Sequence, residues 1–309
     1  MPVELFMEPK TPAMSWDEFR RTKPPFSVAL DGYVGDGPKH DLEGPYCNFN
    51  HHEGVSRMET RATCAQVQLA IRLGFFRRFR DEKGPLVRLY MNDCDQDIAT
   101  SKLLFERPEL TEHVINPLLN RLIGMEDMLD TTGGAFPYPE DMQALREMAW
   151  IYQPYTLFRS SGRIDRKEAE EYMEVVEDIG QRILAYISGH GKSIPLDTRF
   201  DRIDGGGDGW AMVREIGAQA RTGMFAQGVL AFVSVRERPD GRWTYVIGKM
   251  SPYIRFNVAG ILDALNKAEG CCKDCWGGAT IIGGSPRVAG SVLPPSEVAR
   301  IVESARGPR

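Results

Sequence analysis

Three aspartates at alternate positions, Asp93, Asp95 and Asp97, follow the apolar run at residues 86–91. A short run of bulky apolar residues is typical of a buried strand. Because alternate side chains of an extended segment point to the same side, the three carboxylates are expected to converge where the strand opens into a loop. Ionised carboxylates at close range repel one another unless a cation neutralises them. The segment therefore predicts a buried strand that ends in a metal site.

Two of the five histidines, His51 and His52, are adjacent in the segment Asn48-Phe49-Asn50-His51-His52-Glu53-Gly54. Imidazole and several carboxylates together form a ligand set suited to manganese, magnesium, iron or zinc. We therefore interpret the two segments as parts of one catalytic metal site. A structural calcium loop at the aspartates is the alternative that these residues leave open.

Strand-like and helix-like segments alternate over the first two thirds of the chain. Residues 26–30 and 86–91 are expected to be strands, residues 60–79 a helix, and residues 138–190 wholly helical. This alternation predicts an α/β domain with a mainly parallel sheet and a helical insertion. In such folds ligands bind where strands end and loops begin.

The pattern changes near residue 200, where we place a boundary between a domain at residues 1–200 and a domain at 201–309. The glycine-rich stretch at residues 201–209 is interpreted as a linker or loop. A smaller α/β domain follows, with strands expected at 229–235 and 243–248 and helices at 258–268 and 295–305.

The net charge of the chain limits the kinds of molecule that it is expected to bind. The chain has 38 Lys and Arg residues against 43 Asp and Glu, and a net charge of −5 argues against a general grip on long nucleic acid. It is compatible with a small anionic substrate held by a few arginines. No apolar run approaches the ~20 residues that span a bilayer, and the acidic start lacks the features of a signal peptide. We therefore expect a cytoplasmic protein with no membrane partner, and assembly into a homo-oligomer stays open.

The six cysteines are expected to be reduced thiols in a cytoplasmic chain of this size. Cys272 and Cys275 form a Cys-x-x-Cys pair that could be half of a zinc site. No second Cys-x-x-Cys or further histidine pair accompanies it, so we prefer to interpret these as loop cysteines without a metal.

Several motifs resemble those of the DHH phosphoesterase superfamily. Residues 50–52, Asn-His-His, followed by residues 60–63, Thr-Arg-Ala-Thr, and a helix, resemble the Asp-His-His signature and the Thr-led helix after it. Residues 93–101 resemble the family's His-x-Asp-x-Asp-Ala-x-x-Ser motif, with Asp93 in the place of the histidine. Residues 130–134, Asp-Thr-Thr-Gly-Gly, are similar to its Asp-Thr-Gly motif.

The resemblance extends to the second half of the chain. Residues 283–290, Gly-Gly-Ser-Pro-Arg-Val-Ala-Gly, are similar to a glycine loop of the DHH-associated C-terminal domain, and Arg255 stands where that domain often carries an arginine. The chain departs from the family at three points. Asn50 replaces an aspartate, Ser285 replaces a substrate-binding histidine, and the aspartate motif follows the histidine pair instead of preceding it. The pattern indicates a permuted or strongly diverged member.

The resemblance implies a site with one or two divalent ions, Mn²⁺ first, with Mg²⁺, Fe²⁺ or Zn²⁺ as alternatives. The implied ligands are His51, Asp93, Asp95, Asp97 and Asp130. His52 would hold the site or assist the leaving group. A carboxylate that bridges two ions is sought among Asp31, Asp36 and Asp41. We prefer Asp41, because it leads directly into the strand that carries the histidines, and place Asp31 second.

The implied activity is hydrolysis of a small phosphoester or phosphoanhydride, or of a very short oligonucleotide, by metal-bound hydroxide. Arg255, Arg287, Ser285 and the backbone amides of Gly283 and Gly284 would bind the anionic substrate, with Arg287 also counted among the catalytic residues beside Asp41 and His52. The alternatives are a metal-dependent hydrolase or lyase acting on a non-phosphate small molecule, and a catalytically silent binding module.

Overall fold

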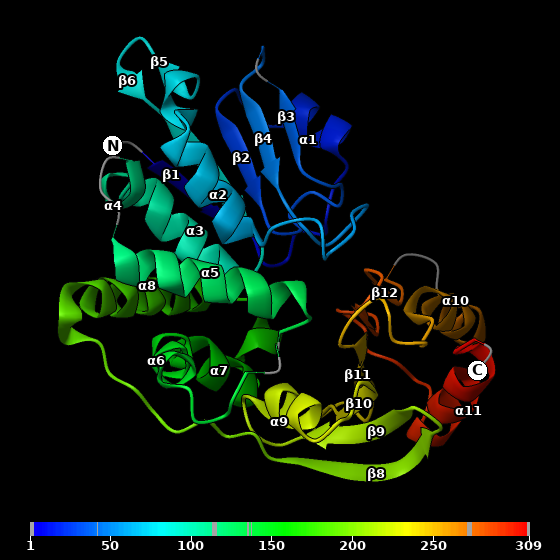
Figure 1. Ribbon diagram of the computed structural model, residues 1–309. Coiled ribbons are helices and arrows are strands. Elements are labelled where there is room, and N and C mark those ends of the chain that lie inside the picture. The colour runs from blue at the N-terminus through cyan, green and yellow to red at the C-terminus, as the bar shows by residue number, and fades with distance from the viewer. Residues whose placement is uncertain are drawn as a thin grey trace. The chain divides into compact units, whose positions relative to one another are not determined.

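Figure 1 shows the computed structural model of the protein, which describes residues 3–41, 43–112, 116–134, 136, 138–270 and 274–307. The chain divides into two units. The first comprises Met1–Val55, Glu59–Met128 and Gln143–Pro195, and the second comprises Ser56–Met58, Leu129–Met142 and Leu196–Arg309. Each unit has its own sheet and its own helices, so the chain is an α/β protein, as expected.

The sheet of the first unit has the strand order β1-β7-β2-β4-β3. The strands are β1 (Val3–Met7), β7 (Val87–Met91), β2 (Ser27–Leu30), β4 (Tyr46–Phe49) and β3 (Lys39–Asp41). Neighbouring strands are parallel except β3, which runs antiparallel to β4. The prediction of a mainly parallel sheet is therefore confirmed. The carboxyl ends of β7, β2 and β4 lie next to one another at one end of the sheet.

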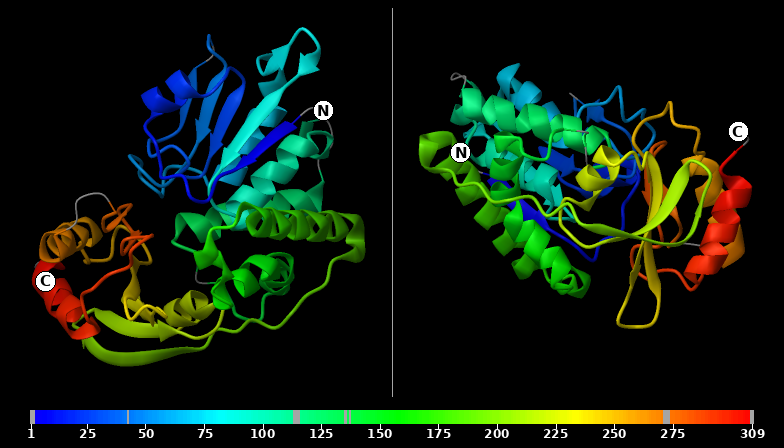
Figure 2. Two further views of the ribbon diagram at one scale, coloured as in Figure 1. Left: turned by 180° about the vertical axis from the view of Figure 1, so that it is seen from behind. Right: turned by 60° about the horizontal axis from the view of Figure 1, so that its bottom comes forward.

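Helices cover both faces of this sheet (Figures 1 and 2). On one face Phe19 packs against Tyr90, and on the other Phe49 packs against Phe105. The buried strands are continuously apolar because both faces are covered. The helices are α1 (Trp16–Thr22), α2 (Thr63–Arg72), α3 (Gln96–Glu106), α4 (Glu109–Glu112), α5 (Pro117–Thr131), α6 (Gln143–Ile151), α7 (Gln153–Ser160) and α8 (Ala169–Ala185).

The helix expected at residues 60–79 is shorter than its pattern suggested. It ends at Arg72, because Gly74 adopts a left-handed conformation with φ 99° that stops the helix. A short 3₁₀ turn at Phe75–Arg77 and the small hairpin of β5 (Arg80–Asp81) and β6 (Gly84–Pro85) follow. Further short helical turns lie at Arg163–Arg166 and Tyr186–His190.

The sheet of the second unit is mixed, with the strand order β12-β13-β11-β10-β9-β8. Only the β9–β10 pair is parallel. Helices α10 (Val258–Glu269) and α11 (Pro295–Ala305) pack on one face, and α9 (Ala220–Ala226) packs on the other. The strands are β8 (Phe200–Gly207), β9 (Trp210–Glu215), β10 (Ala231–Glu237), β11 (Trp243–Lys249), β12 (Gly277–Gly278) and β13 (Ile282–Gly284).

The interpretation of residues 201–209 as a linker or loop was wrong, because most of this stretch forms β8, which pairs antiparallel with β9. A side chain at Gly207 would place its Cβ 2.3 Å from a carboxylate oxygen of Glu303 and 2.5 Å from the indole nitrogen of Trp210. The glycines therefore allow close packing of the strand rather than flexibility. Among the described residues, no helix is long and apolar enough to cross a membrane.

Candidate metal centre

The predicted site segments meet where three adjacent parallel strands end. Asp31 follows β2, His51 and His52 follow β4, and the aspartate motif follows β7. Leu30 of β2 pairs with Phe49 of β4, so the residues after these two strands start at the same level. In open α/β sheets this end of the strands is where ligands bind. The convergence expected from the sequence is therefore present in the first unit.

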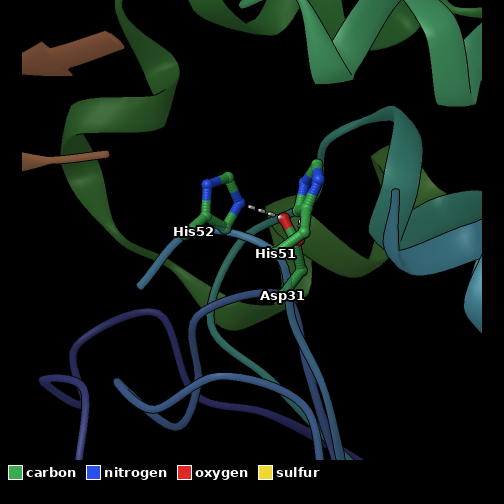
Figure 3. A group of neighbouring side chains, drawn as sticks. All are labelled: Asp31, His51 and His52. Carbon is green, nitrogen blue, oxygen red and sulfur yellow. Dashed lines mark hydrogen bonds and ion pairs between the residues drawn. The ribbon is translucent and has the colours of Figure 1, made fainter. Parts of the chain in front are cut away.

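Asp31, His51 and His52 form the centre of this group (Figure 3). Nε2 of His52 lies 3.0 Å from Oδ2 of Asp31, and Nε2 of His51 lies 3.5 Å from Oδ1 of the same carboxylate. Figure 3 shows the two imidazoles on either side of that carboxylate. The side chain of His51 is fully buried and that of Asp31 is 2% exposed, whereas that of His52 is 25% exposed. One member of the group thus reaches solvent.

Asp97 adds a second buried carboxylate to the group. Its Oδ2 lies 3.6 Å from Nε2 of His51. The carboxylate also accepts hydrogen bonds from the backbone amides of Thr63 (2.6 Å) and Cys64 (2.7 Å), at the start of α2. These amides have no partner within their own helix, so Asp97 satisfies them and is held in place by them.

Thr63 was not predicted to have an individual role in the site. Its hydroxyl donates to Oδ1 of Asp31 at 2.8 Å, and its amide donates to Asp97. It therefore contacts both carboxylates that face His51. The sequence feature that could have indicated this role is the position of Thr63 at the start of the helix that follows the histidines.

Asp31 has a strained backbone. Its φ is 47°, in the left-handed region that residues other than glycine seldom adopt. Such conformations persist where the surrounding contacts enforce them, and they cluster at functional sites. At Asp31 the contacts with Thr63 and His52 hold the side chain in the group.

The buried amide of Asn50 shapes the turn that carries the histidines. Its Nδ2 donates to the carbonyls of Val34 (3.2 Å) and Asp36 (2.9 Å) and to the Glu53 carboxylate (2.8 Å). Its Oδ1 accepts from the amide of His52 at 3.1 Å. An ionised aspartate could accept from His52 but could not donate to the carbonyls. The amide at this position is therefore required by the hydrogen bonds of this loop.

Asp93 and Asp95 lie on the same loop. Asp95 caps α3 by accepting from the amide of Ile98 at 3.0 Å, and Asp93 accepts from the amide of Cys94 at 2.8 Å. Burial raises the pKa of the Asp95 carboxyl well above its usual range, and the charges of Asp31, Asp93 and Asp97 raise it further. The four carboxylates thus repel one another, and a bound cation would relieve that repulsion.

The structure does not bring Asp41 or Asp36 to the histidines. Asp41 pairs with Tyr46 at the beginning of β4, so it lies at the opposite end of that strand from His51. Its carboxylate contacts Arg20 at 2.6 Å. Oδ2 of Asp36 accepts from the amide of Trp16 at 2.8 Å. The preference for Asp41 is corrected, because Asp31, ranked second from the sequence, occupies the position beside the histidines.

Asp130 lies in the last turn of α5, in the part of that helix that belongs to the second unit. Its carboxylate accepts from Nη2 of Arg57 at 3.0 Å, and the same nitrogen donates to its backbone carbonyl at 2.6 Å. The Arg57 side chain is 2% exposed. The Asp130 carboxylate is therefore bound to a buried arginine of its own unit.

The segment expected to be an anion-binding glycine loop begins in a strand and continues as a turn. Gly283 and Gly284 belong to β13, which has β11 on one side and β12 on the other. Backbone groups of an interior strand pair with both neighbours, so these amides are committed to the sheet. Oγ of Ser285 accepts from the amide of Tyr245 at 3.0 Å, and the Ser285 amide donates to the Tyr245 carbonyl. Ser285 thus extends the pairing of β11 and β13.

Arg255 and Arg287, the expected substrate-binding arginines, have exposed side chains in the second unit. The carboxylate of Asp274 accepts hydrogen bonds from three successive backbone amides, those of Arg287, Val288 and Ala289, at 2.6–3.0 Å. The turn after β13 therefore already has an anionic partner from its own chain.

The described cysteines are free thiols: Cys47, Cys64 and Cys94 are buried, and Cys275 is half-buried. Cys271 and Cys272 lie outside the described residues, so the Cys-x-x-Cys pair is not described as a whole. Burial raises the pKa of the Cys47 thiol to about 12 and also raises those of Cys64 and Cys94.

No protein-family model and no curated protein matches this chain. The function is therefore inferred from the geometry of the site and the chemistry of its residues.

Proposed function

We propose that the protein is a metal-dependent hydrolase whose ion is held by His51, His52, Asp31 and Asp97. The observation that carries this proposal is the buried group at the ends of β2, β4 and β7, in which imidazole nitrogens face carboxylate oxygens from two other loops. Asp93 and Asp95 place two further carboxyl groups on the loop beside it.

The distances fit ligands that share one ion. Two ligand atoms that each lie about 2.1 Å from a common ion are separated by roughly 3.0–3.4 Å. The three nitrogen-to-oxygen distances in the group are 3.0, 3.5 and 3.6 Å. The ligand atoms of Asp31, His51 and His52 all lie within 4.8 Å of one another, and Asp97 lies beside the shared member His51.

The donor set favours a transition ion. Calcium and magnesium are bound mainly by oxygen ligands, whereas imidazole suits iron and zinc, and carboxylate oxygen suits manganese. Two histidines in the group therefore argue against the structural calcium alternative. We propose Mn²⁺ first, with Fe²⁺ and Zn²⁺ next.

A divalent ion bound here would lower the pKa of a coordinated water and polarise the attacked group. His51 is fully buried, so it is suited to binding the ion. His52 is partly exposed and its Nε2 is hydrogen-bonded to Asp31, so Asp31 orients its ring as a ligand on the solvent side of the site. Asp97, fixed by the amides of α2, faces the same nitrogen of His51 as Asp31 does.

The substrate that we propose is a small phosphoester or phosphoanhydride. The histidine and aspartate motifs that resemble the DHH phosphoesterases support this class, and so does the lack of a net positive charge that long nucleic acid would require.

A non-phosphate substrate is the second candidate, and one observation favours it. The two glycines that begin the segment resembling the family's substrate loop belong to a strand, and the hydroxyl of its serine accepts from the amide of Tyr245. Parallel screens of phosphate release and of carboxylic ester and amide hydrolysis, with Mn²⁺ present, separate the two candidates.

Elemental analysis of the purified protein tests the proposed site. We expect one to two equivalents of a transition ion in the wild type and a loss in His51→Ala. His40→Ala is the matched control, because His40 lies on β3 with an exposed side chain. Equal metal content in all three proteins would refute the proposed ligands, and no metal after incubation with Mn²⁺ would refute the hydrolase.

A further inference from the structure

An open groove of about 760 Å³ lies between β1, at the edge of the first unit's sheet, and the first half of α8. Leu5 and Met7 of β1 and Met173 of α8 give it an apolar lining. β1 has no strand on its outer side among the described residues, so its backbone edge is also open there.

The rest of the groove lining is acidic. Glu170, Glu174, Glu177 and Asp178 recur at helical spacing along one face of α8, and all four are exposed. Glu177 is bound by Lys102 at 2.5 Å, and Glu174 lies 3.5 Å from Arg163. Within the described part of the chain, Glu170 and Asp178 form no ion pair, and no Lys or Arg lines the groove. The groove therefore combines apolar surface with uncompensated negative charge.

A surface of the opposite character lies on the same unit. The segment at residues 77–83, here named the basic hairpin, stands beyond the end of α2 (Figures 1 and 2). Its buried Phe79 anchors it to the core, and the side chains around that anchor are exposed. Those exposed side chains include four cations: Arg77, Arg78, Arg80 and Lys83.

The basic hairpin is both charged and apolar. Its four cations outnumber the two carboxylates of Asp81 and Glu82 and form no side-chain ion pair among the described residues. Leu73, which lies just before the hairpin, is 75% exposed. Long arginine and lysine side chains place apolar stems on apolar surface while their charged ends reach carboxylates. The hairpin thus matches the groove in both properties.

We infer that the groove binds the basic hairpin of a second copy of this chain. Two grooves cannot face each other, because their carboxylates would repel, and two hairpins cannot for the same reason. The contact is therefore heterologous, with a different surface from each partner. After one such contact the pair keeps a free hairpin on one copy and a free groove on the other, so assembly continues until a ring closes or a chain of subunits forms.

Light scattering of the full-length protein after size-exclusion chromatography, at low ionic strength and rising protein concentration, tests this contact. The wild type is expected to self-associate, and added salt is expected to weaken the association. The double variant Glu170→Lys/Glu174→Lys changes the groove, and the double variant Arg78→Glu/Arg80→Glu changes the hairpin. Each should weaken the self-association about tenfold or more, as expected when close charge pairs are lost. Asp263→Lys/Glu237→Lys, on exposed positions of the second unit, is the charge-matched control.

Mixing the two variants gives the decisive result. One variant retains an intact hairpin and the other an intact groove, and the two altered surfaces again carry opposite charges, so the mixture should associate more strongly than either variant alone. A monomeric wild type, or a mixture that stays monomeric while the wild type associates, overturns the proposal. Binding of an oligoarginine peptide to a monomeric wild type would assign the groove to a different, cationic partner and also overturn it.

Discussion

The hydroxyl of Thr63 donates a hydrogen bond to Oδ1 of Asp31 over 2.8 Å, and this bond joins the start of α2 to the end of β2. Asp31 is the residue between the two histidines, so Thr63 orients a proposed ligand without binding the ion itself. Through its amide it also fixes Asp97. A single residue thus positions both carboxylates of the site.

We predict that Thr63→Val weakens Mn²⁺ binding about 10- to 100-fold, the usual cost of losing a hydrogen bond that orients a metal ligand. Thr63→Ser keeps the hydroxyl and should bind Mn²⁺ nearly as the wild type does. Calorimetric titration of both variants measures the difference. Equal affinity in Thr63→Val and Thr63→Ser would show that the hydroxyl does not position Asp31.

Asn50 is predicted to be required as an amide. In Asn50→Asp the donors to the carbonyls of Val34 and Asp36 are lost, so these buried acceptors lose a partner. We expect a loss of about 1–3 kcal/mol in the free energy of unfolding, measured by urea denaturation. The resemblance to the Asp-His-His signature suggests the opposite, a tolerated or beneficial change, and that outcome would contradict the structural role given to Asn50.

Gly283 is predicted to be needed for packing in the second unit. A Cβ at this position would lie 2.6 Å from Cδ1 of Leu262 and 2.8 Å from the carbonyl oxygen of Gly277. Gly283→Ala should therefore lower the free energy of unfolding by roughly 1–3 kcal/mol. Gly277→Ala, on the paired strand, is the matched control, since a Cβ there meets nothing within 4 Å. Similar stability of the two variants would argue against the close approach of β13 and α10.

The buried thiols are predicted to be protonated and unreactive in the folded protein. Because burial raises the pKa of Cys47 to about 12, almost none of it is thiolate at pH 8. Alkylation by iodoacetamide followed by peptide mass spectrometry should modify Cys275 first, and Cys47, Cys64 and Cys94 only on unfolding. Rapid modification of Cys47 in the folded protein would contradict its burial.

The same pKa shift has a consequence for stability. The thiol of Cys47 ionises more easily in the unfolded chain, where its pKa is near 9, than in the folded chain. Ionisation therefore favours unfolding, and the free energy of unfolding should fall as the pH rises above about 9. The fall should be smaller in Cys47→Ala than in the wild type.

The sequence predicted the features that depend on local pattern. Alternating strands and helices indicated a mainly parallel sheet, and the apolar run before Asp93 located a buried strand whose carboxylates gather at its end. The histidine pair, placed after another strand, was brought to the same end by the parallel arrangement. These outcomes follow from periodicity and from the geometry of parallel sheets.

The sequence could not decide between Asp31 and Asp41, because both lie near the histidines along the chain. The choice depends on strand direction. Asp41 lies at the end of β3. Because β3 is antiparallel to β4, this end lies beside the beginning of β4, far from the histidines. Asp31 instead follows β2, a parallel neighbour of β4. Strand order and direction are set by contacts between distant segments, which local pattern does not record.

The other incorrect predictions concern glycine-rich stretches. Residues 205–207 and 283–284 were interpreted as loop or linker, yet they belong to strands. Their glycines are explained by neighbours that leave no room for a Cβ, such as Glu303 beside Gly207. Those neighbours are remote in sequence, so composition alone could not distinguish close packing from flexibility.

Calorimetric titration of Mn²⁺ into the metal-free wild type, Asp31→Asn and Asp41→Asn tests the central claim most directly. Both substitutions remove one carboxylate charge with little change in shape, and only Asp31 lies beside the histidines. We predict that Asp31→Asn binds Mn²⁺ at least about 100-fold more weakly, more than the loss of an orienting residue would cause, while Asp41→Asn binds as the wild type does. Equal binding by all three proteins, or a loss confined to Asp41→Asn, would contradict the proposed metal centre.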